Sequence, residues 1–320
     1  MYNQNIYYFC VKLEIMSFKR KILSAWLIAA CFATYGQSDI LLTQQWFSRI
    51  NMNPAATGNS DNINVFLLNR QQWIGFENAP STNVLNAHSY FNSIQSGLGF
   101  SMIYDKRGVS HQTVNAMFSY AYHIDLTEEI LLSLGLSGGL FNSNWDPKRH
   151  IDPNLPPTEI DRELNVDKLS PTSADFHAGT EISAYGFTLG ASVTHLLNSK
   201  PDNFKPGREI YGYLRYRRAI DRNFDIAPGI MYRNGNYSNY FDINVMGYYL
   251  KKYWAGLSFR PNNSFAAMLG MEYGMFRVGY AYDRSIGTTS SLSLNSHEIL
   301  LFIRIQKPQQ GRITNRYLDY

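Results

Sequence analysis

The feature that most constrains the fold is a two-residue alternation of side-chain character that recurs along most of the chain. Between residues 114 and 122, Val, Ala, Phe and Tyr occupy every second position, and smaller or more polar side chains lie between them. The segments 131–140, 187–194, 241–246 and 298–303 repeat the pattern with Leu, Ile, Val and Phe. Because successive side chains of a strand point to opposite faces, the pattern predicts β-strands with one apolar face.

A soluble β-sandwich and a membrane β-barrel both produce such alternation, and strand length separates them. We predict strands near residues 62–70, 83–91, 97–105, 112–123, 128–141, 172–182, 185–195, 209–219, 223–233, 237–248, 252–260, 264–273, 275–284 and 295–305. Many of them reach the roughly nine to eleven residues of a tilted membrane strand, whereas sandwich strands usually have about five or six.

Aromatic residues mark the ends of many of these runs, and they make up 15% of the chain. They include Tyr104, Tyr120, Tyr122, Tyr232, Tyr248, Tyr249, Trp254, Tyr280 and Tyr282. Aromatic girdles at both membrane interfaces are typical of outer-membrane barrels. The sequence therefore predicts an all-β fold, a transmembrane antiparallel up-and-down barrel of about 14 strands in the bacterial outer membrane.

The N-terminus carries an export signal. Lys19, Arg20 and Lys21 precede an apolar run over residues 22–33, which is the layout of a secretory signal peptide. We predict cleavage after Gly36, which makes residues 1–36 the signal peptide. Residues 1–15 precede this layout and are interpreted as a misannotated extension, with Met16 as the true start. Lipidation of Cys31, within Ile28-Ala29-Ala30-Cys31, is the alternative processing route.

The remaining chain divides into three predicted parts. Residues 37–61 form an N-terminal segment, with a short helix over 41–50, that either plugs the barrel or tethers it on the periplasmic side. Residues 62–305 form the barrel, and residues 306–320 form a polar periplasmic tail. Two long connections, 142–170 and 198–208, are expected on the extracellular side, where barrel loops are longer.

Composition and motifs argue against two other functional classes. The net charge is only +4, and basic residues form no long run, so we expect no nucleic-acid binding. No nucleophile, zinc-protease or phosphate-loop motif is present, and the seven His residues do not fall at metal-ligand spacing. His88, His123 and His177 are expected to be structural groups on polar strand faces. We predict no catalytic, cofactor or metal residues and no enzyme activity.

One triplet resembles a catalytic triad, Ser296-His297-Glu298, but alternation in a strand places His297 on the face opposite the other two. Ionisable residues on the polar faces are expected to point into the lumen, because charges facing lipid are costly. They are Arg70, Asp105, Asp175, Glu181, Asp242, Glu272, Arg277, Asp283 and Glu298. Their mixed signs favour a narrow or plugged interior filled by ion pairs over an open channel.

Several short motifs together resemble the PorP/SprF family of Bacteroidota outer-membrane proteins. They are Trp46-Phe47 with Asn53-Pro54-Ala55-Ala56-Thr57-Gly58, Arg70-Gln71-Gln72-Trp73-Ile74-Gly75 with Pro80-Ser81-Thr82, Gly97-Leu98-Gly99 with Asp105 and Gly108, Val193-Thr194-His195-Leu196-Leu197, Tyr280-Ala281-Tyr282-Asp283, and Ser296-His297-Glu298-Ile299. Each motif is weak alone, and their order and joint presence carry the resemblance. The chain lacks the terminal Phe of many outer-membrane barrels, although Phe302 lies in the last predicted strand.

The resemblance implies a role in type IX secretion and gliding motility. The expected partners are a secreted cargo or surface adhesin, other secretion and motility machinery proteins, a periplasmic peptidoglycan-binding lipoprotein, and outer-membrane lipid. The candidate partner-binding loop residues are Trp145, Asp146, Arg149, His150 and Asp152, and the candidate family-motif residues are Asn53, Pro54, Gly58, Arg70, Trp73, Asp283, His297 and Glu298. The alternative function is a transporter or channel for a small or hydrophobic solute.

Overall fold

The structure is a computed structural model that describes residues 40–150, 167–198, 205–235, 239–286 and 295–307. The predictions for the signal peptide, the extension 1–15, Cys31 and Asp152 fall outside the described residues, as does the tail beyond residue 307. Among the described residues, no helix is both long and apolar enough to span a membrane.

Strands make up most of the described chain. They are β1 (Ile63–Gln71), β2 (Ser81–Phe91), β3 (Ser96–Arg107), β4 (His111–Asp125), β5 (Ile130–Trp145), β6 (Thr172–Ala184), β7 (Phe187–Thr194), β8 (Glu209–Tyr216), β9 (Arg218–Ala219), β10 (Phe224–Gly235), β11 (Asn239–Tyr249), β12 (Tyr253–Arg260), β13 (Ser264–Tyr273), β14 (Phe276–Ser285) and β15 (Asn295–Ile305). The remaining elements are short 3₁₀ helices: η1 (Gln45–Phe47), η2 (Arg49–Asn51), η3 (Pro54–Ala56), η4 (Asn92–Ile94) and η5 (Pro147–His150).

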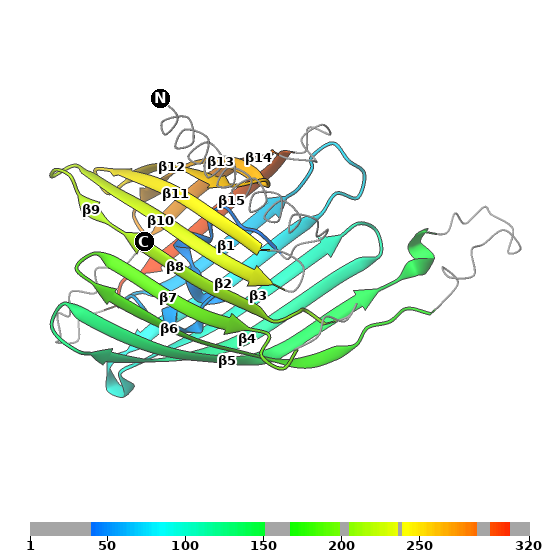
Figure 1. Cartoon of the computed structure of the whole chain (residues 1–320), viewed down its shortest axis with the longest axis horizontal. Helices are drawn as coiled ribbons and strands as arrows, with labels where there is room; N and C mark the ends of the chain where they lie inside the picture. The colour runs from blue at the N-terminus through cyan, green and yellow to red at the C-terminus, as the bar shows by residue number, and fades with distance from the viewer. Residues whose placement is uncertain (1–39, 151–166, 199–204, 236–238, 287–294, 308–320) are drawn as a thin grey trace, which may run out of the picture. The chain divides into compact units, whose positions relative to one another are not determined.

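The strands close into a barrel (Figure 1). Each strand pairs antiparallel with its neighbours in the chain, and β1 pairs with β15 over nine residue pairs from Ile63–Ile305 to Gln71–His297. The two-residue β9 continues β8 along β10, so the fifteen segments form a barrel of 14 strands. This confirms the predicted fold class and strand count. Closure leaves no sheet edge to be satisfied inside lipid, which is why barrels can span membranes.

Connection length differs between the two ends of the barrel. The connections 92–95, 126–129, 185–186, 220–223, 250–252 and 274–275 lie at one end, together with the start of β1 and the end of β15. The long connections 72–80, 146–171, 195–208 and 286–294 lie at the other end, together with the short connections 108–110, 236–238 and 261–263. Since outer-membrane barrels have short periplasmic turns and longer extracellular loops, the first end is the periplasmic one. In Figure 1, β5 and β6 extend furthest toward the extracellular end.

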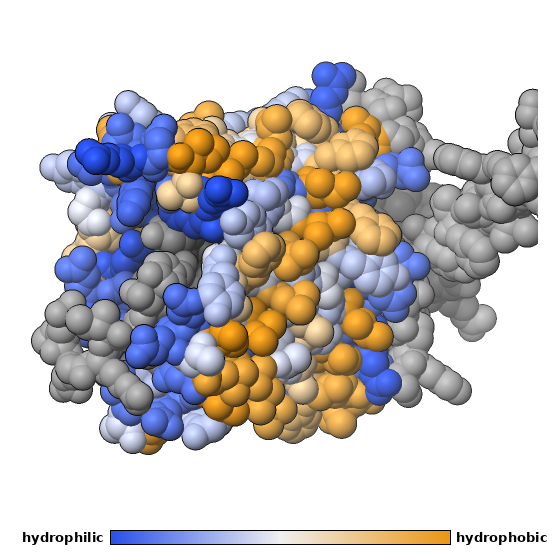
Figure 2. All heavy atoms as spheres, turned by 60° about the vertical axis from the view of Figure 1, so that its left-hand side comes forward, coloured by the Kyte–Doolittle hydropathy of each residue, from blue (hydrophilic) through white to orange (hydrophobic). Residues whose placement is uncertain are grey.

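The alternation of side chains sorts them between lumen and lipid. In β4, Phe118, Tyr120 and Tyr122 are exposed on the outer wall, whereas Ser119 and His123 are buried. The other strands show the same pattern, and Figure 2 shows that hydrophobic residues gather in a band on the outer wall with hydrophilic residues toward both ends. The apolar face of each strand therefore meets the membrane.

Two local details differ from the sequence prediction. β10 runs to Gly235 rather than to residue 233, because the ladder with β11 extends to the Asn234–Asn239 pair. β5 runs to Trp145 rather than to residue 141, since the β4 partner strand reaches His111 opposite it. In both places continued pairing extends the strand beyond its apolar stretch.

Residues 40–62 lead into the barrel wall from within the lumen. In place of the expected helix over 41–50 the structure has the two 3₁₀ helices η1 and η2, and the Thr43 and Gln44 backbone N–H groups that precede them donate to a wall carboxylate. Residues 40–58 contact the inward face of many strands, and we call them the plug.

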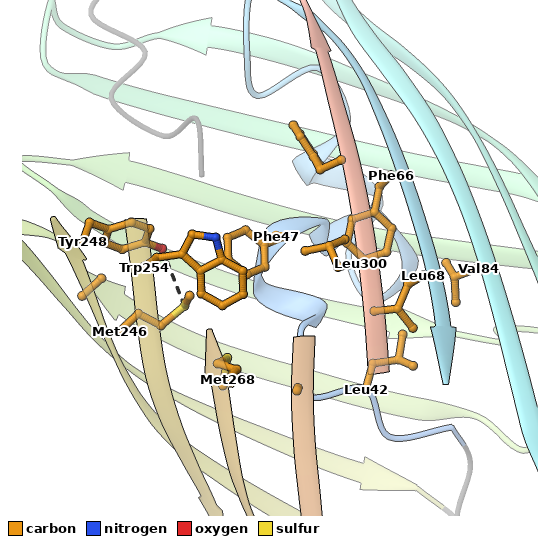
Figure 3. Packing of buried hydrophobic residues seen from close by; sticks show 13 residues of the cluster. Leu42, Phe47, Phe66, Leu68, Val84, Met246, Tyr248, Trp254, Met268 and Leu300 are labelled. Carbon is orange, nitrogen blue, oxygen red and sulfur yellow. Dashed lines mark hydrogen bonds between the residues drawn. The ribbon is translucent and has the colours of Figure 1, made fainter. Parts of the chain in front are cut away.

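The apolar residues of the plug belong to two separate hydrophobic clusters in the lumen. In Figure 3, Leu42 and Phe47 of the plug lie among Phe66, Leu68 and Leu300 from one side of the wall and Met246, Tyr248 and Trp254 from the other. The Phe47 and Trp254 ring centroids are 4.6 Å apart. Trp46 and Met52 join Tyr211, Tyr213 and Met231 in the second cluster. The core of this protein therefore lies inside the barrel and includes the plug.

Candidate functional site

The Glu298 carboxylate on β15 holds the start of the plug. It accepts hydrogen bonds from the Thr43 N–H at 2.7 Å and the Gln44 N–H at 2.9 Å. Arg70 of β1 donates to the same carboxylate at 2.7 Å. Arg70 and Glu298 are also register partners in the β1–β15 ladder, so one ion pair spans the seam where the barrel closes and holds the start of the plug.

A second carboxylate extends this network along the wall. Asp283 Oδ2 on β14 accepts from Arg70 at 3.2 Å and from Arg260 at 3.0 Å. Arg260 Nε donates to Asp242 on β11 at 2.8 Å, and its Nη2 donates to the Leu42 carbonyl of the plug at 3.2 Å. The three carboxylates and two guanidinium groups of this network are buried, and each is satisfied by an opposite charge.

The middle of the plug is held by Arg49. Its Nε and Nη2 both donate to the Glu181 carboxylate of β6 at 3.0 Å, a two-pronged geometry that favours Arg over Lys. The Tyr213 hydroxyl of β8 also donates to Glu181. Removing one member of such a buried pair leaves an uncompensated charge, at a cost of about 3–5 kcal/mol.

Asn53 caps the 3₁₀ helix that starts at Pro54. Its Oδ1 accepts from the Ala55 N–H at 2.9 Å, and its Nδ2 donates to the Thr180 carbonyl at 3.0 Å and the Tyr213 hydroxyl at 2.9 Å. Pro54 fits the first helical position because it has no N–H to satisfy there. The Asn-Pro-Ala motif therefore both turns the chain and attaches it to the wall.

The plug ends against the first strands. The Gly58 N–H donates to His88 Nδ1 at 3.0 Å, and His123 Nε2 donates to the Thr57 carbonyl at 2.8 Å. Gly58 has a φ of +70°, and a Cβ on it would lie 2.5 Å from the Gly97 Cα. These contacts explain why glycine is needed at position 58, and His88 and His123 have the structural roles expected of them.

The other candidate residues lie apart from this network. Trp73 lies in the connection after β1 on the extracellular side, with a φ of +52° and a partly exposed ring. His297 faces outward, with the Tyr280 hydroxyl 2.6 Å from its Nδ1, whereas Ser296 and Glu298 are buried in the lumen. The three residues of the triad-like run are thus split between two faces.

Four of the five predicted partner-binding residues, all except Asp152, belong to the described part of the chain and lie at the base of the longest connection. Trp145 ends β5, and its N–H and carbonyl pair with the Leu169 carbonyl and N–H at 2.8 and 2.9 Å. Asp146 donates its N–H to the Ser110 carbonyl at 3.0 Å, and Arg149 and His150 belong to η5. Lys148 donates to Asp167 at 2.9 Å, which lowers the pKa of that carboxyl. The base of the connection is therefore closed by pairing.

The structure brings Asp175, His177 and His195 together at the extracellular end of β6 and β7. Their spacing in the sequence did not predict this cluster. A backbone of φ +54° at His195 places its imidazole beside Asp175. No sequence pattern marks that conformation.

Comparison with known proteins decides the family. Residues 34–303 match the family model described as type IX secretion system membrane protein PorP/SprF. The chain belongs to the PorP/SprF family. The motif residues Asn53, Gly58, Arg70, Asp283 and Glu298, on which the resemblance was based, all belong to the hydrogen-bond networks that attach the plug to the wall. With its barrel fold, this PorP/SprF protein is an outer-membrane protein.

Solved structures with similar folds are also barrels. The Pseudomonas putida toluene transporter TodX has 8% identity and a TM-score of 0.50, with 86% of this chain and 97% of TodX covered. The Ralstonia pickettii toluene transporter TbuX has 10% identity and a TM-score of 0.48, with coverages of 81% and 93%. The Acinetobacter baumannii outer membrane protein Omp33 has 9% identity and a TM-score of 0.47, with coverages of 77% and 99%. At these identities the likeness concerns the fold of this PorP/SprF protein. No curated protein matches it significantly.

Proposed function

We propose that this PorP/SprF protein is an outer-membrane partner of type IX secretion that helps to export or anchor one cell-surface cargo, such as a gliding adhesin. The observation that carries the proposal is the family match over residues 34–303. Other secretion and motility proteins, and a periplasmic peptidoglycan-binding lipoprotein, are the further partners proposed.

The plugged lumen supports a binding role over a conducting one. The plug places apolar clusters and a buried ion pair in the lumen. Its displacement would leave the Glu181 carboxylate without Arg49 and would remove the Thr43 and Gln44 N–H donors from Glu298. A folded cargo would therefore dock outside the lumen. The extracellular connection after Trp145 is the proposed docking element, because aromatic and Arg side chains are frequent anchors of interfaces.

Affinity purification tests the proposal. The tagged protein is cross-linked in cells of its native host and purified from outer membranes in detergent, and co-purifying proteins are identified. We expect one large exported surface protein to be enriched, and we expect deletion of the chromosomal copy to abolish display of that protein at the cell surface.

A loop variant locates the docking site. Deleting residues 149–166 keeps the Trp145–Leu169 pairing, so the barrel should still fold and still show a heat-dependent gel shift. Loss of cargo capture and display with the barrel intact would support docking on this connection. Normal surface display of every exported protein in the strain that lacks the chromosomal copy would contradict the secretion role.

The alternative, transport of a small or hydrophobic solute, predicts a different result. A transporter would leave surface display unchanged and would slow the uptake of one nutrient when deleted. Measuring uptake of hydrophobic substrates in the same deletion strain therefore separates the two functions.

A further inference from the structure

Three ligand-type side chains converge on the inner wall near the extracellular end of the barrel. Asp175 and His177 lie two residues apart on β6 and share its inward face. His195 follows the last residue of β7. Asp175 Oδ2 lies 2.7 Å from His195 Nδ1 and 3.3 Å from His177 Nε2. The three candidate ligand atoms all lie within 4.8 Å of one another.

The conformation of His195 creates this convergence. Thr194 points into the lumen, so continued strand alternation would turn the next side chain outward. A φ of +54° at His195 breaks the alternation and brings its imidazole to 5.0 Å from the His177 ring. A residue other than glycine is rarely held in this left-handed region, and such strain is often found at functional sites.

The Asp175 carboxylate at the centre of the cluster has one oxygen that accepts no hydrogen bond. Asp175 is 1% exposed, and its Oδ1 has no hydrogen-bond partner. Asn115 donates to Oδ2 at 3.2 Å, while its own side-chain oxygen also lacks a partner. A buried carboxylate oxygen without a donor is costly. A cation would satisfy it.

We propose that Asp175, His177 and His195 bind one divalent transition-metal ion of the Zn²⁺ type. Two imidazole nitrogens and one carboxylate oxygen are a donor set suited to Zn²⁺ and related ions, and a tetrahedral site with bonds of about 2.1 Å separates its ligands by about 3.4 Å. The three groups reach this spacing with shifts of about an ångström or less. The fourth position is open to Asn115 or water. The His195 side chain is 12% exposed, which gives the ion a way in.

Zinc binding by the purified mature protein tests this site. The protein carries a tag without His residues, is stripped with EDTA in detergent, and is titrated with ZnCl₂ against a chromophoric chelator. We expect about one Zn²⁺ per chain, no comparable binding of Mg²⁺, and a rise in the thermal unfolding midpoint with Zn²⁺.

Three variants and one control assign the binding. Asp175→Asn, His177→Asn and His195→Asn should each weaken zinc binding at least tenfold and remove the thermal shift. Asn tolerates the left-handed backbone at position 195, so that variant should fold. His111→Asn changes a histidine at the same end of the barrel, outside the cluster, and should bind like the wild type.

Two results would contradict the proposed site. The first is a wild-type protein that binds no stoichiometric zinc. The second is unchanged zinc binding in all three variants, each shown to be folded by its heat-dependent gel shift. The metal site does not depend on the secretion role. Loss of cargo capture and loss of zinc binding are measured separately.

Discussion

At the scale of single residues, the plug depends on wall positions that carry no side chain. Gly135 of β5 lies where a Cβ would be 2.2 Å from the Ala55 nitrogen, far inside any permitted contact. The plug backbone therefore lies directly against the wall at this point. Gly212 of β8 provides a comparison, because a Cβ there would meet nothing within 4 Å.

We expect Gly135→Ala to displace the plug from the wall and Gly212→Ala to leave it in place. Overpacking of a close contact typically costs about 1–3 kcal/mol. Limited proteolysis in detergent, followed by mass spectrometry, would show faster cleavage within residues 40–62 of the Gly135 variant. Equal cleavage rates for the two variants would contradict the close contact.

The residue scale is also where the sequence was least informative. The inward charges could be predicted, since lipid excludes them, and the structure pairs Arg70 with Asp283 and Glu298 inside the lumen. Their contacts with Thr43 and Gln44 could not be predicted, because the plug has no periodicity that fixes its path. The position of His195 depends on one backbone angle.

At the scale of elements, alternation accounts for nearly all of the barrel. The predicted strands correspond to the observed ones, with shifts of a few residues at their ends, because a strand between lipid and a filled lumen must separate apolar from polar side chains. The observed strand ends differ from the predicted ones where backbone pairing with the neighbouring strand continues beyond the alternating apolar residues, as at Trp145 and Gly235. The helix predicted over 41–50 is replaced by two 3₁₀ helices, since contacts with the wall, rather than local helix propensity, set the backbone conformation there.

The lipid-facing side of β5 gives a direct test. Leu136 is 63% exposed near the middle of the strand, and Leu126 is 53% exposed in a periplasmic turn. We expect Leu136→Arg to lower the free energy of unfolding in lipid by about 2–4 kcal/mol, and Leu126→Arg by about 0–1 kcal/mol. Urea unfolding in liposomes measures both. A Leu136 variant as stable as the Leu126 variant would place this face of β5 away from lipid.

At the scale of the whole molecule, the barrel and the plug form one folded unit. The wall provides closure without free edges, and the plug supplies the inner surface on which inward apolar groups such as Trp254 and Phe302 are buried. The Arg49–Glu181 ion pair fixes the plug to β6, and the Glu298 carboxylate of β15 holds its start through the Thr43 and Gln44 N–H groups.

The formation of a disulfide between plug and wall tests most directly whether the plug lies inside the barrel. A Cβ at position 99 would lie 2.9 Å from Thr57 Cγ2, and 2.7 Å from the Cδ1 end of the Ile50 side chain, which has to turn aside. In a disulfide the sulfur of one residue lies about 3 Å from the Cβ of the other. The chain's two cysteines, Cys10 and Cys31, lie in the predicted signal peptide and are replaced by serine in both variants. Thr57→Cys with Gly99→Cys is compared with Thr57→Cys with Leu98→Cys, since Leu98 faces outward.

Both double variants are folded in detergent, oxidised, denatured and treated with a maleimide–polyethylene glycol tag that adds mass to each free thiol. The account predicts that the variant pairing positions 57 and 99 takes up no tag, because its thiols have joined, and that the variant pairing positions 57 and 98 takes up two tags. Two tags on both variants would show that Thr57 does not lie beside the inner face of β3, and would contradict the described position of the plug.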